Sequence, residues 1–351
     1  MNPILALARP DILEMEPYQH ARWDPSLERL HANEMPWRAP GDNTLAGLNR
    51  YPEPQPQALI ARLAELYEVA PQNVLAGRGS DEAIDLLVRA FCRAGQDGVV
   101  VCPPTFGMYR VAARIQGARV IEAPLTADEF ALDLPAVISA GQQARLVFLC
   151  SPNNPTGRLL DEEMVLEACR QLAANALVVV DEAYVEFASR TSLSRHLKEH
   201  PNLVVLRTLS KAWALAGARC GSLLAGADIV DLLRRIIPPY AITAATVDEV
   251  LELTELRQRA VVESRTGIIR RERERVRTGL TASPGVVRVH ESDANFLLVR
   301  CRDPQQVMRA AAETGLLLRN FSRAPGLEGC VRITIGTPEQ NDRLLAAVEQ
   351  T

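Results

Sequence analysis

The sequence predicts an α/β fold: a large domain with a mostly parallel central sheet flanked by helices, followed by a smaller α+β domain. Two observations lead to this expectation. Apolar runs of strand length alternate with segments of helical periodicity through residues 80–225. Within runs such as ALVVVD and LVVLRT the apolar residues are consecutive, as is typical of strands buried on both faces of a parallel sheet.

The expected elements follow in chain order. In the large domain we expect strands at 99–102, 119–122, 146–150, 176–181, 203–207 and 222–225. Between them we expect helices at 80–93, 104–116, 162–173 and 192–199. A long helix rich in Arg and Glu, 247–281, leads to strands at 286–290, 295–300, 316–318 and 331–335 and helices at 304–313 and 338–349.

The chain of 351 residues is long enough for two domains. We expect an irregular N-terminal arm at 1–42 that packs on the small domain, a large domain at 43–255, and a small C-terminal domain at 256–351. No internal repeat or low-complexity linker interrupts this organisation.

Composition excludes several classes of function. With 39 basic and 43 acidic residues the net charge is −4, so the basic surface typical of nucleic-acid binding is not expected. No apolar run approaches the roughly 20 residues that span a bilayer. The five histidines have no metal-ligand spacing, and the seven scattered cysteines contain no CxxC, so we expect no metal and a reducing, cytoplasmic location.

Lysine is scarce in this chain. Only Lys198 and Lys211 occur among 39 basic residues, and the other 37 are arginine. Genome composition explains such a bias, and Lys198, in RHLKEH, fits a solvated helix. Lys211 lies in TLSKAWALAG, directly after an apolar strand, where a primary amine can form an imine and lose its proton near neutral pH.

Three predicted strands end in polar motifs. RLVFLC runs into SPNNPTG, ALVVV into DEAYVEF, and LVVLR into TLSK. Ligands of open α/β sheets bind beyond the carboxyl ends of the strands. We therefore expect Asn154, Asp181 and Lys211 to meet at one edge of the sheet.

These residue types suit pyridoxal phosphate. A carboxylate such as Asp181 keeps the pyridine nitrogen of this cofactor protonated, so that the ring can act as an electron sink. Tyr184 and Asn154 can hydrogen-bond the 3-oxygen of the ring. The alternatives are structural, because Asp after a strand also caps helices and NPTG is also an ordinary turn sequence.

The cofactor phosphate requires donors. GRGSDEAIDLLVRAF predicts a helix start at which Gly79, Ser80 and Asp81 offer backbone amides, although plain N-capping explains the same residues. Thr208 and Ser210 flank the lysine with hydroxyl groups.

Two further side chains complete the expected cofactor site. Arg219, eight residues after the lysine, can pair with the phosphate through two N–H groups. Tyr109, in PPTFGMYR, can stack on the pyridine ring, and its alternative is a core aromatic on a helix face.

At this point the motifs SPNNPTG, DEAYVEF and TLSKAWALAGARCG resemble the fold-type I aminotransferases, which depend on pyridoxal phosphate. The passages HANE, RYPEPQP, GRGSDEAIDLLVRAFC, CPPTFGMYR and VRITIGT are similar to the histidinol-phosphate aminotransferase family in particular. The resemblance extends over nearly the whole chain, with HANE in place of the family's usual NANE as one departure.

The resemblance implies transamination of L-histidinol phosphate with 2-oxoglutarate, giving imidazole acetol phosphate and L-glutamate in histidine biosynthesis. Lys211, Asp181 and Tyr184 match the family's catalytic residues. The same resemblance implies a homodimer whose active sites lie at the subunit interface.

Five further positions match residues with roles in the family. Tyr51 matches a residue that reaches the partner subunit's cofactor phosphate. Arg332 matches the arginine that binds the acidic group of the substrate, and Arg319 and Tyr18 match residues that help to bind the substrate phosphate. Asn33 matches an asparagine at the substrate site.

Three alternatives remain open. An aromatic amino-acid aminotransferase and a threonine-phosphate decarboxylase share the same fold and motifs. A non-catalytic sensor that binds pyridoxal phosphate is a more remote alternative, because such proteins carry a separate DNA-binding module and the arm lacks a helix-turn-helix pattern.

Overall fold

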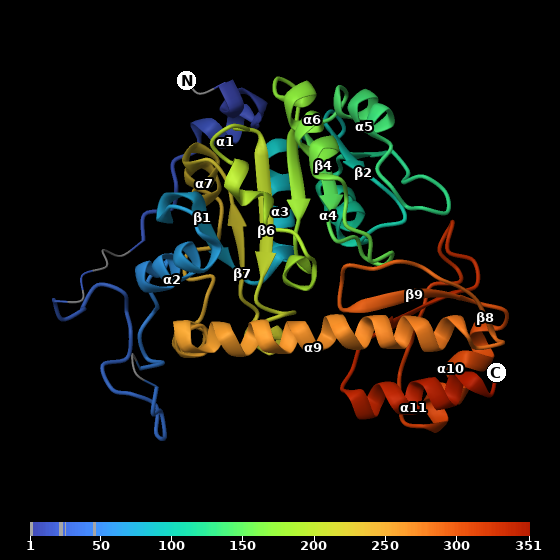
Figure 1. Ribbon diagram of the computed structural model, residues 1–351. Coiled ribbons are helices and arrows are strands. Elements are labelled where there is room, and N and C mark those ends of the chain that lie inside the picture. Colours follow the sequence, from blue (N-terminus) through green and yellow to red (C-terminus); the bar gives the residue numbers. More distant parts are fainter. Residues whose placement is uncertain (1–2, 21–23, 25, 45–46) are drawn as a thin grey trace.

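The computed structural model describes residues 3–20, 24, 26–44 and 47–351, which form two sheets, each with its own core (Figure 1). Residues 1, 2, 21–23 and 25 of the predicted arm lie outside the described part. Among the described residues, the larger sheet has the strand order β1-β7-β6-β5-β4-β2-β3. Its strands are β1 (Val74–Gly77), β2 (Gly98–Val101), β3 (Arg119–Glu122), β4 (Leu146–Cys150), β5 (Leu177–Asp181), β6 (Leu203–Thr208) and β7 (Gly221–Leu224).

The centre of this sheet is parallel, as predicted. Strands β6, β5, β4, β2 and β3 pair in parallel, whereas β7 runs antiparallel to both β1 and β6. Every residue of β4, β5 and β6 is buried, because helices cover both faces. Strand β1 was not predicted, since a four-residue strand ending in glycine gives little signal.

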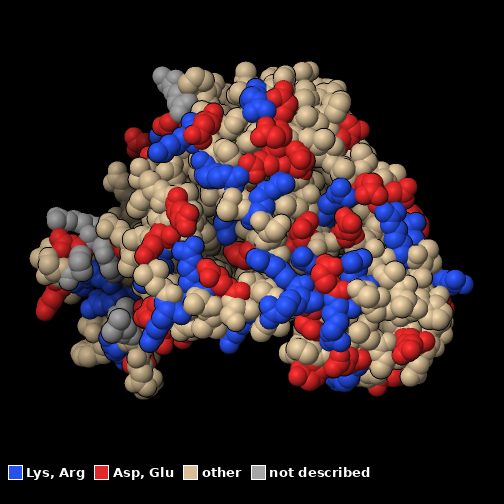
Figure 2. All heavy atoms as spheres, viewed as in Figure 1, with Lys and Arg blue, Asp and Glu red and all other residues tan. Residues whose placement is uncertain are grey.

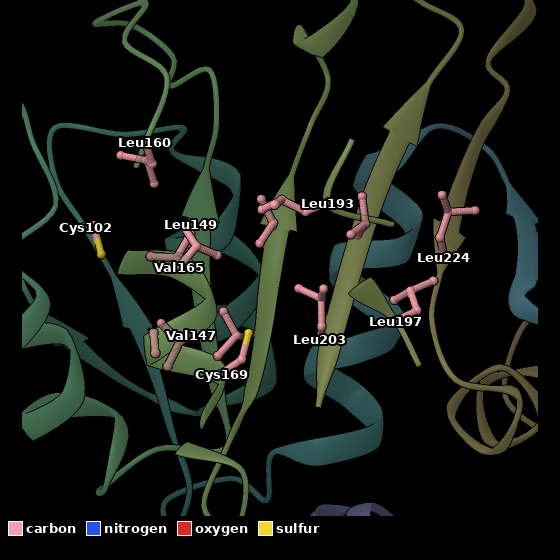
Figure 3. Packing of buried hydrophobic residues seen from close by; sticks show 14 of the residues in the cluster. Cys102, Val147, Leu149, Leu160, Val165, Cys169, Leu193, Leu197, Leu203 and Leu224 are labelled. Carbon is pink, nitrogen blue, oxygen red and sulfur yellow. The ribbon is translucent and has the colours of Figure 1, made fainter. Parts of the chain in front are cut away.

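The helices divide between the two faces of the sheet. One core contains α2 (Gln57–Tyr67), α5 (Leu134–Gly141), α6 (Glu162–Leu172) and α8 (Ala244–Leu253), and the other contains α3 (Ser80–Phe91), α4 (Met108–Gln116) and α7 (Ala227–Arg234). Figure 3 shows part of the first core, where Val147 and Leu149 of β4 lie near Val165 and Cys169 of α6. Burial of these side chains holds the strand ends in fixed positions.

The start of the chain packs on the large domain, so the prediction that the arm packs on the small domain is wrong for this part. The 3-10 helix η1 (Pro3–Leu7) and helix α1 (Pro10–Glu14) lie beside α7, away from the small domain (Figure 1). Ile4 and Leu7 join the core that contains α3 and α7, and the Arg9 amide donates to the carbonyl of Ala90. The apolar stretch PILAL is therefore a packing segment.

The small domain is a four-stranded antiparallel sheet with the order β10-β11-β9-β8. Its elements are β8 (Val286–Val289), β9 (Phe296–Cys301), α10 (Pro304–Glu313), β10 (Arg319–Asn320), β11 (Cys330–Thr334) and α11 (Pro338–Glu349). Helix α9 (Leu256–Thr281) runs beneath the large domain, passes between β9 and α11 in the small domain, and contributes Val276 and Leu280 to the small-domain core (Figure 1).

Three predicted elements differ from the structure. The predicted helix at 247–281 is two helices, because the backbone of Glu255 leaves the helical conformation between α8 and α9. The strand predicted at 316–318 lies at Arg319–Asn320 instead. Leu316 still belongs to the turn that ends α10, because its amide donates to the carbonyl of Ala311. The predicted helix at 192–199 is reduced to the 3-10 turn η4 (Leu193–His196).

The surface matches the balanced composition. On the face seen in Figure 2, basic and acidic side chains are interspersed among the described residues. No helix in the described part of the chain is long and apolar enough to cross a membrane. Among the described residues, no group of three or more His, Cys, Asp or Glu side chains could hold a metal ion, so no metal centre is added to the expected site.

Candidate active site

A pocket of about 640 Å³ lies where the carboxyl ends of β4, β5 and β6 meet the start of α3 and the small-domain strands β10 and β11. Twelve of the predicted site residues line it: Gly79, Ser80, Asp81, Asn154, Asp181, Tyr184, Thr208, Ser210, Lys211, Arg219, Arg319 and Arg332. The parallel strands explain this convergence, because their carboxyl ends share one edge of the sheet.

Lys211 lines the pocket three residues after the end of β6. Partial desolvation lowers the pKa of its ammonium group, and the Arg332 guanidinium lowers it further. A larger fraction of the amine is therefore neutral than in an ordinary lysine, which favours nucleophilic attack and proton transfer.

Asp181 ends β5 and is only 2% exposed. One carboxylate oxygen, Oδ1, accepts the Ala183 amide at 3.1 Å, and the other, Oδ2, accepts the Tyr109 hydroxyl at 2.7 Å. Burial raises the pKa of this carboxyl to about 6 despite these two bonds. The carboxylate is thus poised to gain a cationic partner from the pocket.

Asn154 and Tyr184 lie side by side at the pocket wall. The Asn154 amide donates to the Tyr184 hydroxyl at 3.4 Å, and its oxygen accepts Arg332 Nη1 at 2.5 Å. The Tyr184 ring packs edge-on against Phe296 of β9, with ring centroids 5.1 Å apart. Burial raises the pKa of Tyr184, so its hydroxyl stays protonated and can donate to a ligand.

The start of α3 is shaped for an anion. Gly79 has φ +88°, and a Cβ there would lie 2.9 Å from Nη2 of Arg219. A Cβ on Gly221 would lie 2.6 Å from the Gly79 backbone, so only glycine lets β7 approach this turn. Within the described part of the chain no side chain caps the helix start, so its first backbone amides are available beside Arg219, Thr208 and Ser210.

Arg319 and Arg332 lie directly opposite each other on β10 and β11. Among the described residues neither forms an ion pair with a carboxylate, and the buried Nε of Arg332 has no hydrogen-bond partner. Burial lowers the pKa of Arg332, and Arg319 adds to the effect. Two adjacent guanidinium groups with unused donors form a site for an acidic group.

The predicted role of Tyr109 is wrong. Its ring is fully buried behind the pocket and stacks on Phe148, with centroids 4.8 Å apart, so it cannot stack on a ligand in the pocket. Phe106, which the sequence reasoning missed, lines the pocket instead. Both rings belong to PPTFGMYR, and only the position of α4 against β4 decides which one faces the ligand.

Other pocket residues were also missed. Thr105, Gly107, Cys150, Ala183, Ala216 and Phe321 line the pocket. Thr105 and Gly107 could have been predicted as pocket residues, because they follow β2 at the same edge of the sheet. Phe321 could not have been predicted from the sequence, since its position depends on how the small domain packs against the large domain.

Three predicted residues lie outside the pocket of their own chain. Tyr18, Asn33 and Tyr51 are all exposed, and none of them lines it. Tyr51 stacks on Tyr240 instead, with ring centroids 4.6 Å apart. These residues belong to the N-terminal arm and the segment after it, which the structure does not bring to the pocket.

The fold and the pocket together define a class of enzyme. A family model for aminotransferases of class I and II matches residues 37–348, so the chain belongs to this class. A solved structure of histidinol-phosphate aminotransferase from Sinorhizobium meliloti, in complex with pyridoxal-5'-phosphate, superimposes with a TM-score of 0.78 at 28% identity, over 86% of this chain and 83% of that one. A second solved structure, L-threonine-O-3-phosphate decarboxylase from Porphyromonas gingivalis, gives a TM-score of 0.71 at 26% identity, over 86% and 90%.

Sequence comparison distinguishes between the histidinol-phosphate aminotransferase and the decarboxylase as relatives of this chain. The histidinol-phosphate aminotransferase of Stenotrophomonas maltophilia (strain R551-3) is 46% identical over 360 residues, which cover 99% of this chain and 97% of that protein. The chain belongs to the histidinol-phosphate aminotransferase family.

The cofactor of this enzyme is pyridoxal phosphate, and the residues of the pocket fit it. The cradle kept open by Gly79 and Gly221 suits the phosphate. The buried Asp181 carboxylate suits a protonated ring nitrogen, and the pocket contains a primary amine, Lys211, of the kind that can form an imine with the cofactor.

Proposed function

We propose that this chain transfers the amino group of L-histidinol phosphate to 2-oxoglutarate at the pocket described above, and so serves histidine biosynthesis. The observation that carries the proposal is the convergence of Lys211, Asp181 and Arg332 from three separate elements on one pocket. Full-length similarity to the Stenotrophomonas maltophilia enzyme supports the choice of substrate.

Each side chain has a role that follows from its surroundings. Pyridoxal phosphate, when bound, takes up the electron pair left on the substrate carbon once that carbon loses its proton. Lys211 Nζ accepts the proton from this carbon, which its lowered pKa favours. Asp181 carries the negative charge that holds a proton on the ring nitrogen.

The walls of the pocket bind and orient. Arg219, the amides at the start of α3, Thr208 and Ser210 hold the cofactor phosphate. Asn154 and Tyr184 donate to the ring oxygen from the opposite side. The Phe106 ring provides the apolar face against which the cofactor ring packs.

Substrate recognition falls to the small domain. Arg332 and Arg319 accept the phosphate of one substrate and a carboxylate of the other, because a guanidinium matches either anion. Tyr18 and Asn33 add contacts to the substrate, as the family pattern implies.

The active unit is a homodimer in this proposal. Tyr51 reaches the cofactor phosphate of the partner subunit, and its exposed position outside its own pocket supports this role. The same part of the chain exposes further large apolar side chains, Leu30, Trp37 and Leu48, which suits burial against a second copy. The seven cysteines are buried and unpaired, which supports a cytoplasmic location.

The substrate proposal is tested by steady-state kinetics. The purified protein, supplied with pyridoxal phosphate and 2-oxoglutarate, is assayed for glutamate with L-histidinol phosphate and with phenylalanine, and for CO2 with threonine phosphate. We expect kcat/KM to be highest for histidinol phosphate, by at least about tenfold over phenylalanine, because phenylalanine lacks the phosphate group that the two arginines bind. A higher kcat/KM for phenylalanine would identify an aromatic amino-acid aminotransferase instead, and release of CO2 would identify a threonine-phosphate decarboxylase.

A further inference from the structure

Tyr109 is the largest fully buried side chain of the described structure and lies directly behind the pocket. Its ring packs parallel to Phe148, with an interplanar angle of 5°, and meets Phe106 edge-on at 5.6 Å. Phe106 in turn lines the pocket. Tyr109 therefore has no direct contact with a ligand and can act only through its neighbours.

The one polar group of Tyr109 points at the catalytic carboxylate. Its hydroxyl donates to Asp181 Oδ2 at 2.7 Å, while the Ala183 amide donates to Oδ1 at 3.1 Å. A carboxylate has about four lone-pair positions, so two donors orient it and leave acceptor capacity for the pocket side. The orientation of Asp181 is thus fixed from behind by two independent elements, α4 and the turn after β5.

The environment of Asp181 makes this donor matter. Burial favours the neutral acid and raises the pKa of Asp181 to about 6, whereas the Tyr109 hydroxyl favours the charged form. The charged and titratable groups that face Asp181 are Asp81 on α3, Cys150 on β4, Tyr184 after β5 and Lys211 after β6.

Tyr109 itself keeps its proton. Burial and the nearby Asp181 charge raise its pKa well above the ordinary value, so the hydroxyl remains a donor at every working pH.

We propose that Tyr109 is a positioning residue whose hydroxyl holds the Asp181 carboxylate oriented toward the pocket to receive the ring nitrogen of pyridoxal phosphate. The inference rests on the proposed cofactor role of Asp181 and goes beyond it, because it places part of that role in a residue outside the pocket.

Tyr109→Phe isolates the effect, since it removes one oxygen and keeps the ring that packs on Phe148 and Phe106. The chain offers a matched control in Tyr67, which is also buried and whose hydroxyl donates to no carboxylate among the described residues. Tyr67→Phe removes the same atom from the other face of the sheet. Asp181→Asn, alone and combined with Tyr109→Phe, completes a double-mutant cycle.

The experiment titrates the cofactor-free proteins with pyridoxal phosphate between pH 5.5 and 8.5 and measures the dissociation constant by absorbance. At neutral pH we expect Tyr109→Phe to bind about tenfold more weakly than the natural protein, as for the loss of a hydrogen bond to a charged group. The loss of affinity on acidification should begin roughly one pH unit higher in Tyr109→Phe, because its Asp181 protonates more readily. Tyr67→Phe should follow the natural protein at every pH.

The double variant decides between positioning and general structure. We expect Tyr109→Phe to have little further effect in the Asp181→Asn background. An unchanged dissociation constant and pH profile in Tyr109→Phe would overturn the inference, as would an equal loss with and without Asp181. If the natural protein and Tyr67→Phe bind no cofactor, the proposed function itself fails.

Discussion

At the scale of the residue, the Asp181 carboxyl combines a proposed role in cofactor binding with a cost in stability. Its carboxyl is buried beneath the pocket and has its pKa raised from 3.8 to about 6. Between these two values the folded, cofactor-free chain binds more protons than the unfolded chain. The free energy of unfolding therefore falls as the pH rises from about 4 to about 6 and stays lower above that range.

Asp181→Asn should consequently stabilise the cofactor-free protein. Above pH 7 we expect its free energy of unfolding to exceed that of the natural protein by up to about 3 kcal/mol, with the difference vanishing near pH 4. Urea denaturation at several pH values measures this, with Asp85→Asn as a control that changes little, because Asp85 is half-exposed and loses only an ion pair with Arg89 at the surface. A variant that is no more stable at pH 7 than the natural protein would contradict the assigned cost of the buried charge.

At the scale of elements, α9 connects the two domains through a buried arginine. Arg273 donates from Nη1 to the carbonyl of Ala294 at 2.8 Å and to that of Phe187 at 3.4 Å. Phe187 follows β5 in the large domain, and Ala294 precedes β9 in the small domain. Both lie in the hydrophobic cluster in which Tyr184 packs on Phe296. Arg273 therefore supports the contact between Tyr184 of the large domain and Phe296 of the small domain.

Arg273→Met should loosen this contact and leave two buried carbonyls without their donor. We expect a loss of about 1–3 kcal/mol in the free energy of unfolding and a several-fold rise in KM for histidinol phosphate, with a smaller effect on kcat. Arg277→Met on the same helix, which removes an exposed ion pair with Glu274, is the matched control. Equal kinetics and stability for the two variants would show that Arg273 has no such role.

Particular elements show what could be predicted from the sequence. Strands β4, β5 and β6 could be predicted with the residues that follow them, because consecutive apolar residues and the motifs at their ends are local signals. That Phe106 and not Tyr109 lines the pocket could not be predicted, since it depends on which face of α4 packs against β4. The break after Thr254 depends on the extended backbone of a single residue, Glu255, which periodicity does not reveal.

At the scale of the whole molecule, the N-terminal region has two different roles. Residues 3–14 pack on the large domain, whereas Tyr18, Asn33 and Tyr51 are exposed and lie outside the pocket. Their proposed roles depend on substrate and, for Tyr51, on a second copy, so no reasoning from a single chain could place them.

Subunit complementation tests the proposed exchange of Tyr51. Lys211→Ala and Tyr51→Ala chains are each expected to be inactive or nearly so. In heterodimers formed by co-expression, one site combines an intact Lys211 with an intact Tyr51 from the partner, which should restore about a quarter of all sites in a random mixture. If Tyr51 acted within its own chain, mixing would restore no activity.

The most direct test of the account uses the scarcity of lysine. The protein with bound pyridoxal phosphate is reduced with borohydride, digested, and mapped by mass spectrometry. We predict that the cofactor is attached to Lys211 alone, with the exposed Lys198 as an internal control for nonspecific labelling. We also predict that Lys211→Ala and Lys211→Arg lose both the label and the transamination. Attachment at Lys198, or normal turnover by either variant, would contradict the central claim that Lys211 holds the cofactor and moves the proton.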